Sequence, residues 1–218
     1  MGWFGALADA QMNVSVDAVS NGPGYVNGSL WGMYGDNTAI VNQYGSQAGE
    51  AWAAGFTGKL TTVVGVIDTG IDYTHPDLYR NVWLNQGEIT ADIKSHLMDT
   101  DQDGLYTFRD LNNVANWNAN NAYVIDLNKN GFIDAGDLLR NSLWANGVDN
   151  DQNGFKDDLI GWDFVNNDND PYDDNGHGTH VSGIIGATGG NGVGVVGVNW
   201  DVQLVAMKFL SAERNFIA

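Results

Sequence analysis

Asn175-Gly176-His177-Gly178-Thr179-His180-Val181-Ser182-Gly183 places two histidines three residues apart, with a glycine on each side of the first. The apolar spacing after it predicts a short helix that begins near His177 and buries Val181, Ile184, Ile185 and Ala187. Glycines beside a histidine allow backbone or substrate to come close to its ring. A partly exposed histidine at a helix N-terminus is well suited to proton transfer, although a lone histidine of this kind can equally just end a loop.

A second stretch supplies an acid as a partner for His177. Residues 60–67 form a continuous apolar, β-branched run, the pattern of a strand covered on both faces, as in a parallel sheet. Asp68 follows this run, and open α/β sheets gather functional groups at the carboxyl ends of their strands. We expect further strands at 159–165 and 202–210 and a short helix at 47–54.

Two other interpretations of these motifs are disfavoured. Aspartic proteases also contain Asp-Thr-Gly, but they need two such carboxylates and usually carry Ser or Thr next. This chain has one Asp-Thr-Gly, at 68–70, followed by Ile71. His177 and His180 could share a helix face as zinc ligands, but no further ligand is spaced to complete such a site.

Composition limits the function classes. A formal charge of −18 argues against nucleic-acid binding and fits a protein that binds cations. The chain has 218 residues, 43% of them hydrophobic, and no cysteine, so we expect one core with insertions and no disulfide or thiol nucleophile. No apolar run is long enough to span a membrane. Residues 1–10 lack the positive start of a complete signal peptide, and we treat 1–28 as a leader of unclear structure.

Acidic loops recur in what we interpret as an insertion at about 89–146. The first matches positions one, three, five, six and twelve of a calcium-binding loop with Asp99, Asp101, Asp103, Gly104 and Asp110. The second matches positions one, three, five, six, nine and twelve with Asp126, Asn128, Asn130, Gly131, Asp134 and Asp137. Alternate residues of such loops turn oxygens toward calcium while the glycine makes a sharp turn.

A third acidic stretch begins the same pattern but does not complete it. It has Asp149, Asp151, Asn153, Gly154 and Asp157, but Ile160 stands at position twelve. The first two loops end in Asp rather than the bidentate Glu of an EF-hand, and so are closer to dockerin-type bacterial loops. Solvated turns rich in Asp and Asn are the alternative explanation for all three.

Together these motifs resemble a known family. Residues 66–71 with His75-Pro76-Asp77-Leu78, and residues 175–183, resemble the Asp and His signatures of the subtilisin-like serine peptidases, the subtilases (peptidase S8). Residues 192–198 and 204–208 resemble the segment that follows the His helix in that family. The resemblance covers roughly 30–210, apart from the insertion, and implies a partial subtilisin-like α/β fold with a central parallel sheet.

The resemblance also implies roles for residues. Asp68 would orient His177, which would exchange a proton with a serine hydroxyl during peptide-bond cleavage of protein or peptide substrates. One Ca²⁺ would be shared by Asp77, Asn191 and the carbonyls of Gly189, Val193 and Val195. A second, thermitase-like calcium site would use Asp163, Asp168 and Asp170. The family also suggests secretion.

The nucleophile of the family is missing from these 218 residues. No Gly-Thr-Ser-x-Ala segment is present, and Ser182, five residues past His177 on one helix, is rotated roughly 140° away from it. We therefore expect 29–218 to be an incomplete catalytic domain, inactive alone. The alternative is a non-catalytic calcium-binding or interaction protein on a partial protease scaffold. The sequence does not indicate the oligomeric state.

Overall fold

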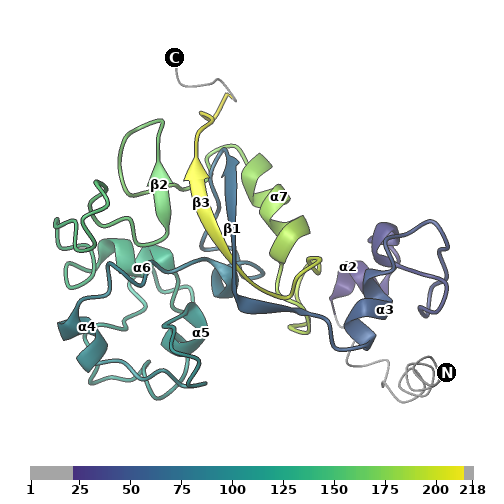
Figure 1. Cartoon of the computed structure of the whole chain (residues 1–218), viewed down its shortest axis with the longest axis horizontal. Coiled ribbons are helices and arrows are strands. Elements are labelled where there is room, and N and C mark those ends of the chain that lie inside the picture. The colour runs from purple at the N-terminus through teal and green to yellow at the C-terminus, as the bar shows by residue number, and fades with distance from the viewer. Residues whose placement is uncertain (1–21, 214–218) are drawn as a thin grey trace, which may run out of the picture.

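A three-stranded parallel sheet in the order β1-β3-β2 lies at the centre of the molecule (Figure 1). The structure is a computed structural model, and it describes residues 22–213. β1 spans Gly58–Asp68, β2 spans Gly161–Asp163 and β3 spans Asp201–Lys208. β3 pairs with β1 from Val63↔Gln203 to Asp68↔Lys208 and with β2 from Gly161↔Ala206 to Asp163↔Lys208. The expected α/β fold with a parallel sheet is confirmed.

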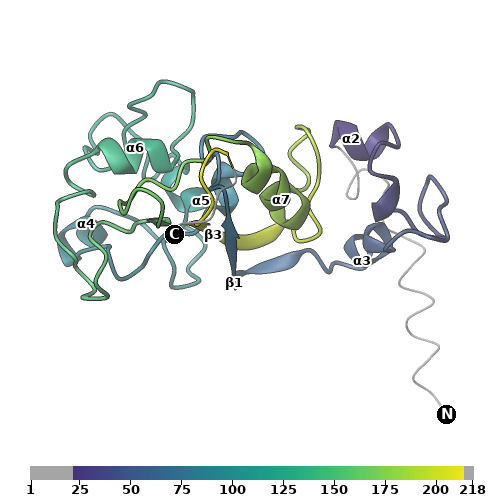
Figure 2. The ribbon, with the colours of Figure 1, turned by 90° about the horizontal axis from the view of Figure 1, so that it is seen from above.

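One face of the sheet is covered by α7, His177–Gly186 (Figures 1 and 2). The buried residues between them are Val66, Ile71, Leu78, Ala187, Val202, Leu204 and Ala206. Val181 and Ile185 of α7 pack against this cluster, as expected. Ile184, however, is 50% exposed, so its expected burial is wrong.

The prediction that 60–67 would be covered on both faces is also wrong for the described structure. Val64 and Val66 face the α7 side, whereas Val63 is 48% and Ile67 is 64% exposed. Successive side chains of a strand point to opposite faces, so a continuous apolar run shows that both faces are apolar but not that both are covered. About half of Val63 and more than half of Ile67 are therefore left open on the other face of the sheet.

The acidic insertion lies at one end of the sheet and has its own hydrophobic core (Figures 1 and 2). It contains α4 (Ala91–Ser95), α5 (Phe108–Leu111) and α6 (Ala135–Arg140), and the short η4 (Tyr79–Asn81) precedes it. Its largest fully buried side chains are Leu84, Ile93, Phe108, Leu111, Ile133, Leu138, Trp144, Leu159 and Ile160. Because Leu84, Leu159 and Ile160 flank the insertion, this core ties it to the sheet region.

The N-terminal segment lies at the opposite end of the molecule (Figure 2). It contains α2 (Pro23–Val26), η3 (Trp31–Met33) and α3 (Ala48–Ala53), the last close to the helix expected at 47–54. Trp52 packs in a cluster with Tyr25, Tyr34 and Val196, and its indole N–H donates to the carbonyl of Val198 at 3.0 Å. Of the predicted leader, 22–28 carries α2, and 1–21 lies outside the described residues. In the described part of the chain no helix is long and apolar enough to cross a membrane.

Candidate active site and cation-binding loops

Asp68 and His177 meet where β1 ends and α7 begins. The distance between His177 Nδ1 and Asp68 Oδ1 is 2.7 Å, within hydrogen-bond range. The Asp68 residue is 8% exposed, whereas the His177 side chain is 43% exposed. Asp68 Oδ1 also accepts the backbone N–H of Thr69 at 2.8 Å. A buried carboxylate therefore holds one nitrogen of an imidazole whose ring reaches the surface.

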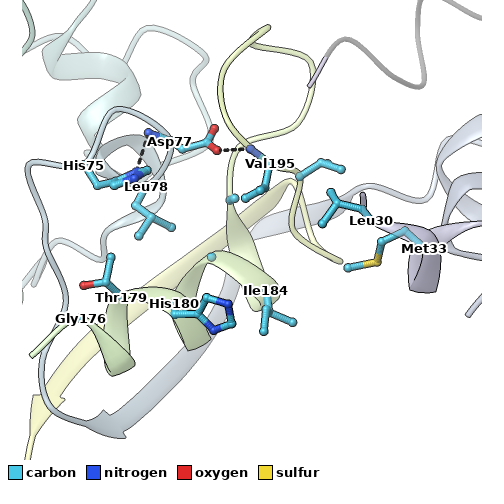
Figure 3. A pocket seen from close by; sticks show the side chains of 13 residues that line it. Leu30, Met33, His75, Asp77, Leu78, Gly176, Thr179, His180, Ile184 and Val195 are labelled. Atoms are coloured by element: carbon cyan, nitrogen blue, oxygen red, sulfur yellow. Dashed lines mark hydrogen bonds between the residues drawn. The ribbon is translucent and has the colours of Figure 1, made fainter. Parts of the chain in front are cut away.

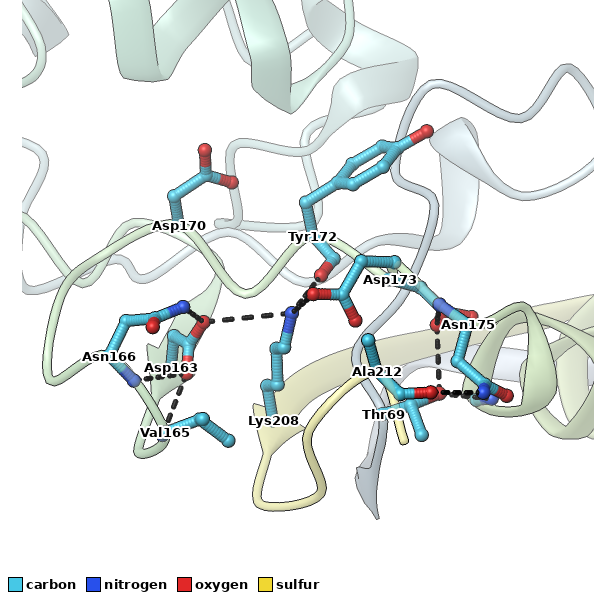
Figure 4. Close-up of polar contacts among 12 residues, drawn as sticks. Thr69, Asp163, Val165, Asn166, Asp170, Tyr172, Asp173, Asn175, Lys208 and Ala212 are labelled. Atoms are coloured by element: carbon cyan, nitrogen blue, oxygen red, sulfur yellow. Dashed lines mark hydrogen bonds and ion pairs between the residues drawn. The ribbon is translucent and has the colours of Figure 1, made fainter. Parts of the chain in front are cut away.

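Asp173, which belongs to neither sequence motif, holds the start of α7 in place. Its Oδ1 accepts the Thr69 hydroxyl at 2.8 Å and the backbone N–H groups of Asn175 and Gly176 at 3.0 and 2.8 Å. Its Oδ2 accepts the N–H and hydroxyl of Thr179 at 2.8 and 2.6 Å. Thr69 follows Asp68 directly, so Asp173 links the strand that carries the acid to the helix that carries the base (Figure 4).

The charge of Asp173 is stabilised by these donors. Burial of Asp173 disfavours its ionised form, but the hydrogen bonds from Thr179, Gly176 and Asn175 outweigh burial and hold the pKa of its carboxyl below its ordinary value. Unpaired N–H groups at a helix N-terminus are normally satisfied by such a carboxylate. An Asp just before the expected helix start was a sequence signal for this role.

The glycines around His177 have separate geometric reasons. Gly176 caps α7 with φ of 98°, a left-handed conformation that glycine adopts without strain. A Cβ at Gly178 would overlap the carbonyl oxygen of Gly70. The absence of a side chain at Gly178 thus lets the first turn of α7 lie directly against the end of β1. This close approach brings the imidazole of His177 to Asp68.

The other polar residues of α7 lie elsewhere. His180 is exposed and lines a cavity of about 300 Å³ together with Met33, His75 and Ile184 (Figure 3). Ser182 is 0% exposed and its hydroxyl has no hydrogen-bond partner among the described residues. Ser182 is therefore shielded from any substrate that approaches His177. The groups of three or more metal-ligating acids and histidines found in the described chain include neither His177 nor His180.

Asp77 gathers several residues of the first expected calcium site. Asp77 is 1% exposed, and its carboxylate accepts the Asn191 amide at 2.7 Å and the Val195 N–H at 2.8 Å. Burial raises the pKa of the Asp77 carboxyl, and the bonds from Asn191 and Val195 oppose that rise. Asn191 Oδ1 in turn accepts the N–H of Val193. The loop that follows α7 is thus folded around a single buried carboxylate, and Gly189 stands at its start.

The residues of the second, thermitase-like site have separate partners. Asp163 accepts the N–H groups of Val165 and Asn166, and Asp170 accepts the Tyr73 hydroxyl at 2.7 Å. Asp168 accepts the N–H of Asp170. The Lys208 ammonium lies 3.8 Å from Asp163 and 2.9 Å from Asp174, and it donates to the Tyr172 carbonyl at 2.8 Å (Figure 4). A cation at Asp163 would compete with this buried ammonium group.

The first two acidic loops have a common design. One carboxylate oxygen from each of Asp99, Asp101 and Asp103 lies within 4.8 Å of the other two. Asp126 accepts N–H groups of Asn130 and Gly131, as Asp99 does from Gln102 and Gly104. Positions nine and twelve also form the capping boxes of short helices, Thr107 with Asp110 in α5 and Asp134 with Asp137 in α6. The side-chain amides of Asn128 and Asn130 both donate to Asp134.

Comparison with known proteins places these motifs in context. Residues 59–216 match the Subtilase family. The chain is 35% identical over 154 residues to a subtilisin-like protease 1 of Plasmodium berghei, covering 71% of this chain and 17% of that protein. The protein of the same name from Plasmodium vivax is 35% identical over 153 residues, covering 70% and 16%. Thermitase from Thermoactinomyces vulgaris is 44% identical over 50 residues, covering 23% and 18%. The chain thus spans less than a fifth of each of these relatives.

Proposed function

This chain belongs to the subtilase family, and from this premise we propose that it supplies the acid and the base of a Ser-His-Asp triad in a serine endopeptidase. The observation that supports this proposal best is the 2.7 Å hydrogen bond between buried Asp68 and exposed His177. Protein or peptide chains are the substrate class, as in the family. We also propose that the protein is secreted, because the family suggests it.

The two residues have different tasks in this reaction. Asp68 accepts a hydrogen bond from Nδ1–H of His177, so it fixes the tautomer in which Nε2 is free to take a proton from a serine hydroxyl. His177 then carries a positive charge that the Asp68 carboxylate stabilises. The same imidazole later gives its proton to the leaving amine. Asp173 and Thr69 are positioning residues, because they fix the strand end and the helix start.

We further propose that residues 1–218 alone do not turn over peptides. None of these residues forms the Gly-Thr-Ser-x-Ala segment of the family, and Ser182 is buried. A triad acts as a unit, so the absence of the serine removes most of its catalytic advantage. With calcium present, we expect neither casein turnover nor labelling by a serine-directed fluorophosphonate. Labelling that disappears in His177→Ala would contradict this proposal.

The orienting role of Asp68 can be tested without any nucleophile. Imidazole ¹⁵N chemical shifts show which ring nitrogen carries the proton, and we expect Nδ1–H in the native chain. Asp68→Asn should favour the Nε2–H tautomer, because an amide N–H can donate to Nδ1. Asp72→Asn is the matched control, since Asp72 bonds locally to Thr74. An unchanged tautomer in Asp68→Asn would argue against the proposed pair.

Calcium is the proposed cofactor. The supporting observations are the close carboxylates at 99–103, the parallel hydrogen-bonding pattern at 126–137 and the loop folded around Asp77. Hard cations accept such mixtures of carboxylate, amide and carbonyl oxygens. Calorimetric titration of the metal-free chain with calcium is the direct test, and no measurable binding would refute it.

The second candidate is a non-catalytic calcium-binding or interaction protein on this scaffold. The density of acidic loops favours it, since the loops surround a well-packed hydrophobic core. The nucleotide sequence after the codon for Ala218 discriminates between the two. An in-frame Gly-Thr-Ser-x-Ala segment favours the peptidase, and an immediate stop codon favours the alternative.

A further inference from the structure

The third acidic loop lacks a carboxylate at its own position twelve. That position is Ile160, which is 0% exposed and directly precedes β2. In the first two loops the same position lies in the first turn of a short helix and carries Asp110 or Asp137. The chain of the third loop instead enters the sheet, where the core requires an apolar side chain. A ligand at position twelve must therefore come from another part of the molecule.

Glu88 supplies a carboxylate at this place from the segment before α4. Its Oε1 accepts the backbone N–H of Asn150 at 3.0 Å and of Asp151 at 3.4 Å, which are positions two and three of the loop. In the second loop, Asp137 Oδ1 accepts the N–H groups of positions two and three at 2.7 and 3.1 Å. Glu88 thus makes the contacts that the terminal carboxylate makes elsewhere.

At position nine of the third loop, too, the expected contact is made by another residue. Asn153 donates its side-chain amide to Asp158 at 2.9 Å, as Asn130 donates to Asp134 at 2.6 Å in the second loop. Asp157, expected at this position, has φ of 54° and accepts the N–H of Gly147 instead. Because Asp157 has this left-handed conformation, the next residue, Asp158, accepts the hydrogen bond from Asn153 in its place. The third loop therefore repeats three contacts of the second loop with different residues.

The second oxygen of Glu88 is the observation that points to a ligand. Glu88 is 0% exposed, and its Oε2 has no hydrogen-bond partner among the described residues. By contrast, both oxygens of Asp137 accept N–H groups, Oδ2 from Asp134. One carboxylate oxygen from each of Glu88, Asp149 and Asp151 lies within 4.8 Å of the other two. A buried carboxylate oxygen without a donor, beside two further carboxylates, is costly unless a cation neutralises it.

The surrounding packing builds this arrangement. A Cβ at Gly87 would lie 2.6 Å from Cβ of Asp151, so only glycine lets the segment before α4 come this close to the loop. The Asn85 amide donates to Asp151 and to Asp158, each at 3.0 Å. The segment before α4 therefore lies against the third loop, with contacts from Asn85, Gly87 and Glu88.

We propose that Glu88, Asp149 and Asp151 form a third cation site, selective for a hard divalent ion such as calcium, in which Glu88 replaces the missing terminal ligand of the loop. This site is separate from the two loops and the Asp77 site proposed above, and it does not depend on peptidase activity. Its affinity should depend on the charge of Glu88, because the number of charged ligands sets calcium affinity.

The test is a calcium titration of the native chain followed by NMR. The backbone amides of Gly104, Gly131 and Gly154 each donate to the first aspartate of one loop, so they report on the three loops separately. We expect the Gly154 signal to shift on calcium addition in the native chain. In Glu88→Gln the response of Gly154 should require at least about tenfold more calcium, while Gly104 and Gly131 respond as before. An unchanged Gly154 titration in Glu88→Gln would overturn the proposal.

Thermal unfolding separates a ligand role from a structural one. Gln keeps the oxygen that accepts the Asn150 and Asp151 N–H groups and removes the unpaired charge. Glu88→Gln should therefore melt at the same or a higher temperature than the native chain in chelator, and at a lower temperature in calcium. Glu50→Gln is the matched control, since Glu50 also accepts a backbone N–H, from Asn37, outside the acidic loops. Equal destabilisation of Glu88→Gln in both conditions would mean a structural role only and would overturn the proposal.

Discussion

Asp173 and Glu88 are two buried carboxylates with opposite environments. Asp173, at the start of α7, is 6% exposed and accepts five hydrogen bonds across both oxygens. Glu88, beside the third acidic loop, is fully buried and accepts two backbone N–H groups on one oxygen only. The protein itself therefore stabilises the first charge, whereas one oxygen of the second carboxylate has no donor among the described residues.

The pKa values of the two carboxyls follow this difference. Hydrogen bonds outweigh burial at Asp173 and hold its pKa below the ordinary value. Burial dominates at Glu88 and raises its pKa to about 7, although the bonds from Asn150 and Asp151 oppose the rise. The region around His177 is thus organised by hydrogen bonds within the chain, and we expect the acidic region to become fully ordered only when it binds cations.

Removal of calcium should give the largest effect, and it should act on one region only. A ligand at 100-fold excess over its Kd stabilises the folded state by about 2.7 kcal/mol per site, so loss of two or more sites should lower the melting temperature strongly. Hydrogen exchange should then show faster exchange at 99–110 and 126–137 and little change in the first turn of α7. Equal loss of protection in both regions would show that the acidic loops do not depend on calcium more than the start of α7 does.

Asp173→Asn should have the next largest effect. The amide keeps the shape but loses the charge and one acceptor, which leaves donors at Thr69 or Thr179 without a partner. We expect a loss of roughly 2 kcal/mol in the free energy of unfolding, measured with urea in saturating calcium. The neighbouring Asp174→Asn is the control, because its 46% exposed side chain makes one ion pair with Lys208. A similar cost for both variants would argue against the special role of Asp173.

Lys208→Met should cost about 1–2 kcal/mol, the scale of one lost hydrogen bond from a charged donor, here to the Tyr172 carbonyl. It removes the ammonium that faces Asp163 and Tyr172, but Asp163 keeps its bonds from Val165 and Asn166. Without this competing charge, calcium should stabilise the variant more than it stabilises the native chain. Exposed Lys156→Met serves as the control. No added response to calcium in Lys208→Met would argue against any cation site at Asp163.

The smallest effect is the dependence of stability on pH that Asp173 contributes. Its pKa is lower in the folded than in the unfolded chain, so its stabilisation is fully present above the unfolded value, about 3.9. It is lost as the pH falls from there through the folded pKa. The stability of Asp173→Asn should thus fall less steeply with acid than that of the native chain. Parallel curves from urea unfolding between pH 5 and pH 3 would contradict this assignment.

Functional residues inside a short motif could be predicted from the sequence, whereas one that lies far along the chain from its partners could not. Asp68 and His177 were predicted because each ends or begins a regular element within a short motif. Asp173 had a usable signal, as an acidic residue just before a helix. Glu88 had none, since it lies about 60 positions from Asp149 and has no acidic neighbour in its own segment. Only the missing terminal carboxylate of the third loop gave reason to look for a ligand elsewhere.

The pairing of β1 with β3 has a consequence for the order of folding. Asp68 and Lys208 are neighbours in the sheet although about 140 positions separate them in the chain. Closing a flexible loop of that length costs about 4 kcal/mol of chain entropy, and contacts of such long range slow folding. The acidic loops and their core close over much shorter distances and fill this interval. Compaction of the insertion before the sheet forms would shorten the effective loop, so the rate at which Asp68 meets His177 depends on the residues between them.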